Sequence, residues 1–155
     1  MECPRCGQDE MREVTEPAAI RFPGRSVSVD ATFLKCGACG KELWRPDQVE
    51  AAHRAAATEI RRREELLMPE EIQALRKRLG LDQREFERLL RVGKKTVTRW
   101  ETGQVFQSQG IDNVMRSLAE VPGLAANMAK RNGVRLPDTP RERLRGRADD
   151  DLAAA

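Results

Sequence analysis

The spacing of apolar side chains changes along the chain, and the predicted secondary structure changes with it. Over residues 26–32, Val27, Val29 and Ala31 alternate with polar residues, which is the two-residue period of a strand with one buried face. Pro23-Gly24 marks a turn before this run, and we expect an earlier strand around residues 12–15. The first 46 residues therefore predict a small β-sheet.

From residue 69 onward the apolar residues recur every three or four positions, which predicts a set of short helices. The first opens with proline and two acids and closes with three bases and a glycine, as capping and the helix dipole favour. The second begins at a capping box formed by Asp82 and Glu85. The five helices are expected over residues 69–80, from 82 onward, 94–101, 109–119 and 123–131.

A separate helix is predicted between these two regions. Asp47 and Glu50 have the spacing of a capping box, and the alanine-rich run that follows favours a helix over residues 48–62. Its apolar side is thin, so it is either a solvated connector or a docking surface. His53 lies on this helix, where a surface or packing role is favoured over metal ligation.

Two cysteine pairs stand at the ends of the predicted sheet, and each has the form C-x2-C-G: Cys3 with Cys6, and Cys36 with Cys39. Four soft thiolates suit tetrahedral Zn²⁺, and a site with four thiolates leaves no position open for water. We therefore predict one structural zinc ion per chain. A redox dithiol and a catalytic zinc site are the alternatives that this pattern leaves open.

These elements predict an α+β chain: a small zinc-clamped β module followed by an all-α five-helix domain with a helix-turn-helix. We expect a zinc module, a helical connector, a DNA-binding domain and a tail rich in proline, arginine and aspartate that is disordered. Their bounds are, in that order, residues 1–46, 47–67, 68–132 and 133–155.

Charge and composition limit the classes of function that the chain can have. The chain has 155 residues and a net charge of +3, and the excess of positive charge lies within residues 69–103, where a phosphate-binding surface would be expected. No apolar run approaches the length of a membrane span, and the N-terminus does not resemble a signal peptide, so we expect a cytoplasmic protein without membrane contact. A single histidine and no recognisable catalytic motif argue against an enzyme.

The predicted third helix of the C-terminal domain has the pattern of a DNA-reading helix. Val97 and Trp100 are its strongly apolar residues and would anchor it, which leaves a basic and polar face outward. Such a face fits the major groove, where arginine pairs with guanine and lysine or threonine reaches phosphates or base edges. The alternative is a helical bundle with solvated charges. The candidate DNA-contacting residues of this segment are Lys94, Lys95, Thr96, Thr98 and Arg99.

The sequence LDQREF at residues 81–86 and VGKKTVTRWETG at residues 92–103 resembles the Xre/Cro-type helix-turn-helix. With the two C-x2-C-G pairs in front, the chain from residue 1 to about residue 130 resembles the MqsA-type antitoxins. That resemblance implies zinc bound by the four cysteines and an N-terminal module that neutralises a toxin, typically an RNA-cleaving enzyme. It also implies a C-terminal domain that forms a homodimer, binds a palindromic double-stranded operator and represses its own operon.

The resemblance assigns further roles to individual residues. Arg99 and Lys95 match positions that contact bases, and Gln83 matches the glutamine that caps the second helix against phosphate. Lys95 stands where the MqsA motif has asparagine, which suggests a different operator; Asp82 and Gly93 also depart from the usual residues. We therefore expect a DNA-binding repressor that is also an antitoxin. A stand-alone regulator without a toxin and a protein-interaction adaptor are the alternatives.

Overall fold

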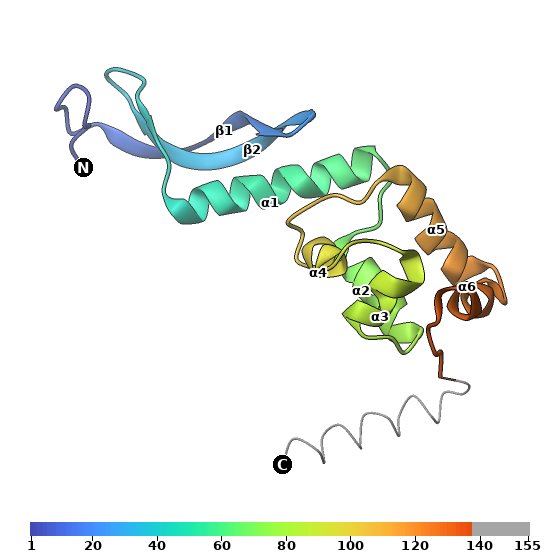
Figure 1. The fold of residues 1–155 in the computed structure, drawn as a ribbon. Coiled ribbons are helices and arrows are strands. Elements are labelled where there is room, and N and C mark those ends of the chain that lie inside the picture. Colours follow the sequence, from blue (N-terminus) through green and yellow to red (C-terminus); the bar gives the residue numbers. More distant parts are fainter. Residues whose placement is uncertain (138–155) are drawn as a thin grey trace, which may run out of the picture. The chain divides into compact units, whose positions relative to one another are not determined.

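The computed structural model describes residues 1–137 and divides the chain into two compact units (Figure 1). The first covers Met1–Glu65 and combines a three-stranded sheet with one helix, and the second begins at Leu66 and contains five helices. The α+β class with a β module ahead of an all-α domain is therefore confirmed. Within the described residues no helix has the length and apolar character needed to cross a membrane.

The sheet of the first unit is a long antiparallel hairpin with a short third strand. Strands β1 (Met11–Phe22) and β2 (Arg25–Cys36) pair along their whole length, and β3 (Glu42–Leu43) adds to β2 in the order β1-β2-β3. The turn lies at Pro23-Gly24, as expected, and Gly24 takes a φ of +72° there. The earlier strand, β1, extends well beyond the predicted residues 12–15. The sequence did not indicate its full length because apolar and polar residues alternate only weakly along it.

Helix α1 (Pro46–Arg63) packs on β2 and so belongs to the same unit as the sheet. The buried residues Ala31, Phe33 and Ala52 form a small cluster there, and the ring of Trp44 stacks on Phe33 with 4.6 Å between centroids. The thin apolar side of this helix is therefore covered by the sheet of its own unit.

The start of α1 differs from the predicted capping box at Asp47. The helix begins two residues earlier than expected, with Pro46 in its first turn, and the side-chain oxygen of Gln48 accepts a hydrogen bond of 3.0 Å from the Arg45 backbone N–H. The reason is that proline is pre-set for the first helical position, where no N–H partner is needed.

The second unit contains the five expected helices around one apolar core. They are α2 (Pro69–Arg78), α3 (Gln83–Leu90), α4 (Thr96–Glu101), α5 (Gln109–Glu120) and α6 (Leu124–Asn132). Every one of them contributes to the core, whose most deeply buried members are Ile72, Phe86, Leu89, Val97 and Met115.

The chain stays with this core beyond α6, in place of the irregular tail predicted from residue 133. Gly133 ends the helix with a φ of +64°, the Val134 N–H donates to the Ala129 carbonyl at 2.9 Å, and Leu136 packs on the core. Both side chains are apolar, which keeps them with the core. The remainder of that predicted tail, from residue 138, lies outside the described residues.

Candidate metal centre and nucleic-acid interface

The four cysteine sulfurs form one tight cluster at the end of the sheet. All lie within 4.8 Å of one another, with 3.6 Å between Sγ of Cys3 and Cys39 and 3.7 Å between Sγ of Cys6 and Cys36. Metal–sulfur bonds of about 2.3 Å in a tetrahedron place the sulfurs about 3.8 Å apart, whereas a disulfide needs about 2.05 Å. The cluster is therefore arranged to bind a metal ion and holds no disulfide.

The two C-x2-C-G segments fold in the same way. In each, the glycine N–H donates to the carbonyl of the first cysteine at 2.9 Å, Gly7 to Cys3 and Gly40 to Cys36. These glycines have φ values of +73° and +71° in the left-handed region, where a side chain would be strained. This conformation explains why glycine follows each pair.

The hairpin places the two segments beside each other. Cys36 is the last residue of β2 and pairs with Met11, the first residue of β1, and the Gly37 N–H donates to the Glu10 carbonyl at 3.0 Å. The 29 residues between the pairs thus return the chain to its starting point. His53 lies outside the cluster, where its ring meets the edge of Phe22 with 5.5 Å between centroids.

Two of the clustered thiols, Cys3 and Cys6, have pKa values that differ from that of a free cysteine. Desolvation raises the pKa of Cys3, but hydrogen bonds from the Arg5 and Cys6 backbone and from the Cys39 and Cys6 thiols outweigh it and lower the pKa to about 6. At Cys6 a hydrogen bond from the Gln8 backbone lowers the pKa, whereas desolvation and the other three thiols raise it to about 12. The two pKa values are shifted in opposite directions because these thiols hydrogen-bond one another, and a bound metal cation would favour the thiolate form of each ligand.

Helix α3 begins at the predicted capping box. The Glu85 N–H donates to Oδ1 of Asp82 at 2.8 Å, and the Asp82 N–H donates to Oε2 of Glu85 at 2.9 Å. Aspartate therefore caps this helix in place of the usual serine or threonine.

Helix α4 begins two residues later than predicted. Lys94 and Lys95 lie in the turn before it, and Lys95 adopts a left-handed conformation with a φ of +62°. Gly93, which directly precedes these two lysines, does not have a positive φ. The first turn of α4 is capped from α3, because Oε1 of the buried Glu87 accepts a hydrogen bond of 3.2 Å from the Val97 N–H.

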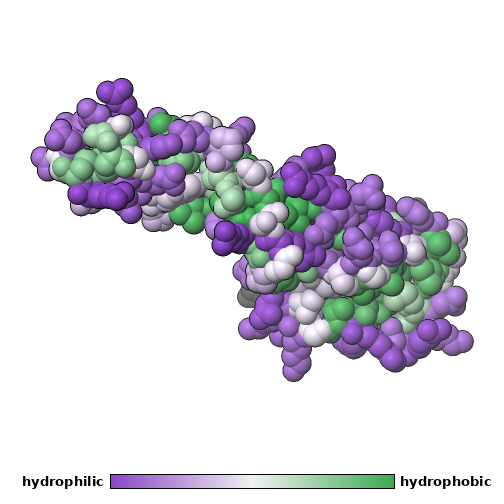
Figure 2. All heavy atoms as spheres, turned by 90° about the horizontal axis from the view of Figure 1, so that it is seen from above, coloured by the Kyte–Doolittle hydropathy of each residue, from purple (hydrophilic) through white to green (hydrophobic). Residues whose placement is uncertain are grey.

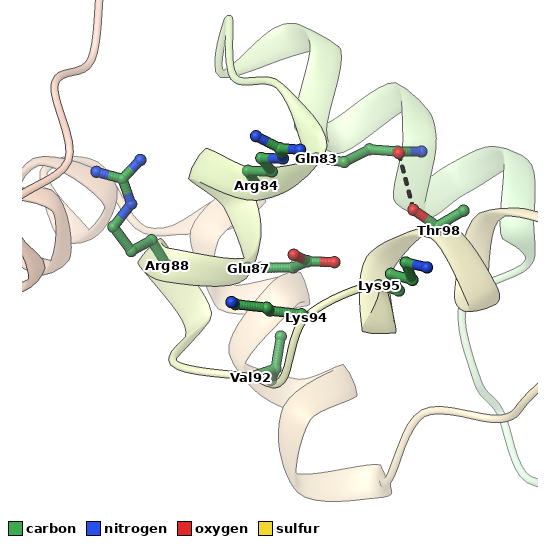
Figure 3. A pocket seen from close by; sticks show the side chains of 8 residues that line it. All are labelled: Gln83, Arg84, Glu87, Arg88, Val92, Lys94, Lys95 and Thr98. Atoms are coloured by element: carbon green, nitrogen blue, oxygen red, sulfur yellow. Dashed lines mark hydrogen bonds between the residues drawn. The ribbon is translucent and has the colours of Figure 1, made fainter.

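The predicted DNA-contacting residues lie where an interface could use them. Val97 and Trp100 are buried, Lys94, Lys95 and Arg99 are exposed, and the two threonines and Gln83 are half-buried. Four of the predicted residues share one hollow of about 680 Å³ between α3 and the start of α4, whereas Thr96 and Arg99 do not line it (Figure 3). The lining residues are Gln83, Arg84, Glu87, Arg88, Val92, Lys94, Lys95 and Thr98. Arg84, Glu87 and Arg88 were not singled out from the sequence.

A polar network fixes α4 against α2 and α3. Thr98 Oγ1 donates to Oε1 of Gln83 at 2.8 Å, and Nε2 of Gln83 donates to Oε2 of Glu101 at 2.9 Å. Glu101 also pairs with Arg76 at 2.6 Å, and Arg76 donates to the Leu81 carbonyl at 2.9 Å. In this structure Gln83 therefore connects α3 with α4.

Comparison with known proteins gives one family. The family model for MqsA, the antitoxin component of bacterial toxin-antitoxin systems, matches residues 1–129 of the 155. No curated protein matches the chain. The matched segment includes the four-cysteine cluster, the sheet and α1 to α5, together with most of α6. The chain therefore belongs to the MqsA family of antitoxins.

Proposed function

We propose that this antitoxin is a dimeric repressor of its own operon that reads DNA with α4. The observation that carries the proposal is the exposed pair Lys95 and Arg99. Lys95 immediately precedes α4 and Arg99 lies within it, and neither forms an ion pair among the described residues. Val97 and Trp100 anchor the helix from its buried side. Arginine and lysine bind the O6 and N7 atoms of guanine in the major groove. The pair is therefore available to select bases.

The network behind α4 supports this role. Glu101 is 3% exposed and Arg76 11% in their side chains, so their bidentate pair is shielded from water. It holds α4 before DNA arrives, which reduces the ordering that binding would otherwise cost. In the complex we place α4 of each protomer in successive major grooves, with half-sites about 34 Å or a multiple apart.

We place the contact between protomers on α5 and α6. Val121 between them is 51% exposed, and Val114, Leu124 and Met128 are only partly buried at the edge of the core. Figure 2 shows apolar side chains reaching the surface of the molecule. A second copy would cover such residues, and Val121→Glu should convert the dimer to a monomer in sedimentation analysis.

We infer that the metal is a structural zinc ion and that the N-terminal unit neutralises a toxin, an RNA-cleaving enzyme. Four thiolates match the coordination of structural zinc, and they leave no open position for a reacting water. The metal would hold the two C-x2-C-G segments together and would fix the hairpin that a partner contacts.

The DNA proposal is tested with the promoter of the chain's own operon. Lys95→Ala with Arg99→Ala should abolish the preference for that promoter over unrelated DNA while leaving the fold intact, because both side chains are exposed. A matched control is Arg12→Ala with Arg21→Ala, which removes two exposed positive charges from β1 in the first unit. Operator preference that survives the first pair would overturn the assignment of α4.

The antitoxin proposal is tested separately, by co-expression of the tagged chain with the adjacent open reading frame. A complex that forms with wild-type protein and also with the Lys95→Ala, Arg99→Ala variant would assign toxin binding to a surface other than α4. Absence of any complex, with operator binding intact, would leave a stand-alone regulator.

A further inference from the structure

Unpaired positive charge gathers beside the DNA-reading helix. Among the described residues, Arg25, Arg76 and Arg116 each donate to a carboxylate at 2.6 or 2.7 Å, which commits them to holding the fold. Arg84 and Arg88 on α3 are exposed and form no such pair with any residue in the described part of the chain. Their charge is therefore free for a ligand.

These two arginines lie one helical turn apart and border the hollow already described. Residues four positions apart share a face of a helix, and Phe86, Leu89 and Leu90 occupy the buried face of α3. Figure 3 shows Arg84 and Arg88 extending from α3, with Lys94 and Lys95 on the segment that leads into α4. The hollow thus has cations on both of its sides.

The wall of the hollow carries the opposite charge. Glu87 is the one acidic residue that lines it in the described part of the chain. The residue is 7% exposed, and its carboxylate accepts a hydrogen bond from the Val97 N–H. A single small anion inside the hollow would approach this carboxylate and be repelled by it. An extended polyanion that crosses the rim of the hollow would contact the two arginines and the two lysines there without approaching the Glu87 carboxylate.

We propose that Arg84 and Arg88 bind backbone phosphates of one DNA strand beside the groove that α4 reads. This inference rests on the proposed function and extends its interface from α4 onto α3. Phosphate contacts fix position and supply affinity without reading sequence, whereas base contacts specify. The arginines of α3 would therefore supply affinity, and Lys95 with Arg99 would supply selection.

The test compares salt dependence rather than affinity alone. The Arg84→Gln, Arg88→Gln double variant should lower the slope of log affinity against log salt by about 0.9 for each lost phosphate contact, or roughly eightfold per contact at 0.1 M salt. Operator and unrelated DNA should weaken by the same factor. The Arg12→Gln, Arg21→Gln variant removes two exposed positive charges from β1, in the first unit, and should keep the wild-type slope.

Each outcome has a distinct meaning. If the double variant binds DNA as tightly as the wild type and with the same salt slope, this inference alone is overturned. If the wild-type protein itself binds no DNA, the proposed function is overturned as well. A loss confined to the operator would mean that these arginines read bases. Sodium phosphate should compete no better than chloride at equal ionic strength; stronger competition would indicate a site for a small anion and contradict the proposal.

Discussion

The two units of this chain reach stability by different means. The second unit has a continuous apolar core to which all five helices contribute, including large side chains such as Phe86 and Trp100. The small cluster in the first unit consists of Phe33 and two alanines, while two of its four cysteines are buried. A unit of 65 residues buries a limited apolar surface, and a metal ion bound by the four cysteines would add stability that burial alone does not supply. The first unit would then depend on metal binding where the second depends on its apolar core.

Removal of the metal should distinguish the two units most clearly. Chelation should unfold much of Met1–Glu65 and leave the helices from α2 to α6 intact, because structural zinc contributes on the order of 10 kcal/mol to folding. Hydrogen exchange on the full chain reads both units in one experiment. Cys36→Ser should reproduce the effect of the chelator, since Cys36 joins the metal site to the end of β2.

Two observations would contradict this prediction. Retained protection in the hairpin after chelation would show that the sheet and α1 suffice without metal. Equal loss of protection in both units would show that the second depends on the first.

The converse change is made in the core of the second unit. Phe86 is fully buried there, and Phe86→Ala should destabilise that unit by about 3–5 kcal/mol through lost burial and the cavity that remains. Exchange in the first unit should not change, and added zinc should not restore the loss. Recovery of the lost stability on addition of zinc would contradict the view that the two units are stabilised independently, one by metal and one by its core.

The pair Arg76–Glu101 tests how the core unit positions its reading helix. Glu101→Gln leaves the nearly buried Arg76 without its counter-charge, so we expect a loss of about 3 kcal/mol in the stability of this unit and weaker operator binding. Urea unfolding and operator titration measure the two effects. The control is Arg76→Met with Glu101→Leu, which removes both charges and should recover part of the stability but not Gln83's hydrogen bond to Glu101. Full recovery of DNA binding would contradict a positioning role for the network.

Local chemistry explains which parts of this fold the sequence could predict. The two C-x2-C-G segments can be predicted from the sequence because each glycine adopts its left-handed conformation next to its own cysteine pair. The Asp82–Glu85 capping box can be predicted because both partners lie within one helical turn. The five helices of the second unit follow from apolar spacing in the same way. Such features depend on neighbours a few residues away, so the order of residues displays them directly.

The rest depends on residues that are distant in sequence. Glu87 caps the first turn of α4 by accepting a hydrogen bond from Val97, ten residues further along the chain, and this contact accompanies the late start of the helix. Arg84 and Arg88 resemble any exposed arginines in the sequence; only the fold shows that they border the same hollow as Lys95. Whether a charged side chain has an ion-pair partner depends on how the chain packs, so the sequence alone did not single out these two arginines.

Lys95 offers a smaller test, because it occupies a conformation that glycine tolerates better. Its φ of +62° costs a non-glycine residue about 1 kcal/mol, so Lys95→Gly should stabilise the second unit by about that amount. Lys95→Ala removes the same side-chain charge but keeps the strained backbone, and its stability should match the wild type. Thermal unfolding of the three proteins measures the difference. Equal stabilisation by both substitutions would attribute the gain to lost charge and not to backbone conformation.

The smallest effect concerns the polar pairs that help the thin core of the first unit. Glu64 accepts two hydrogen bonds from Arg25, and these lower the pKa of its carboxyl group below the ordinary value. Because the folded pKa is lowered, the stabilisation is complete above the ordinary glutamate pKa and disappears as the pH falls through the lowered one.

Glu64→Gln should therefore cost about 0.5–1 kcal/mol at pH 7, and the gap to the wild type should close in acid. Urea unfolding of the first unit at a series of pH values measures that gap, and comparison at equal pH removes the common effect of thiol protonation on the metal. The matched control is Glu50→Gln, because Glu50 and its partner Arg54 are both 72% exposed and should contribute nothing measurable. A gap that persists unchanged in acid would mean that Glu64 acts through packing, not through its charge.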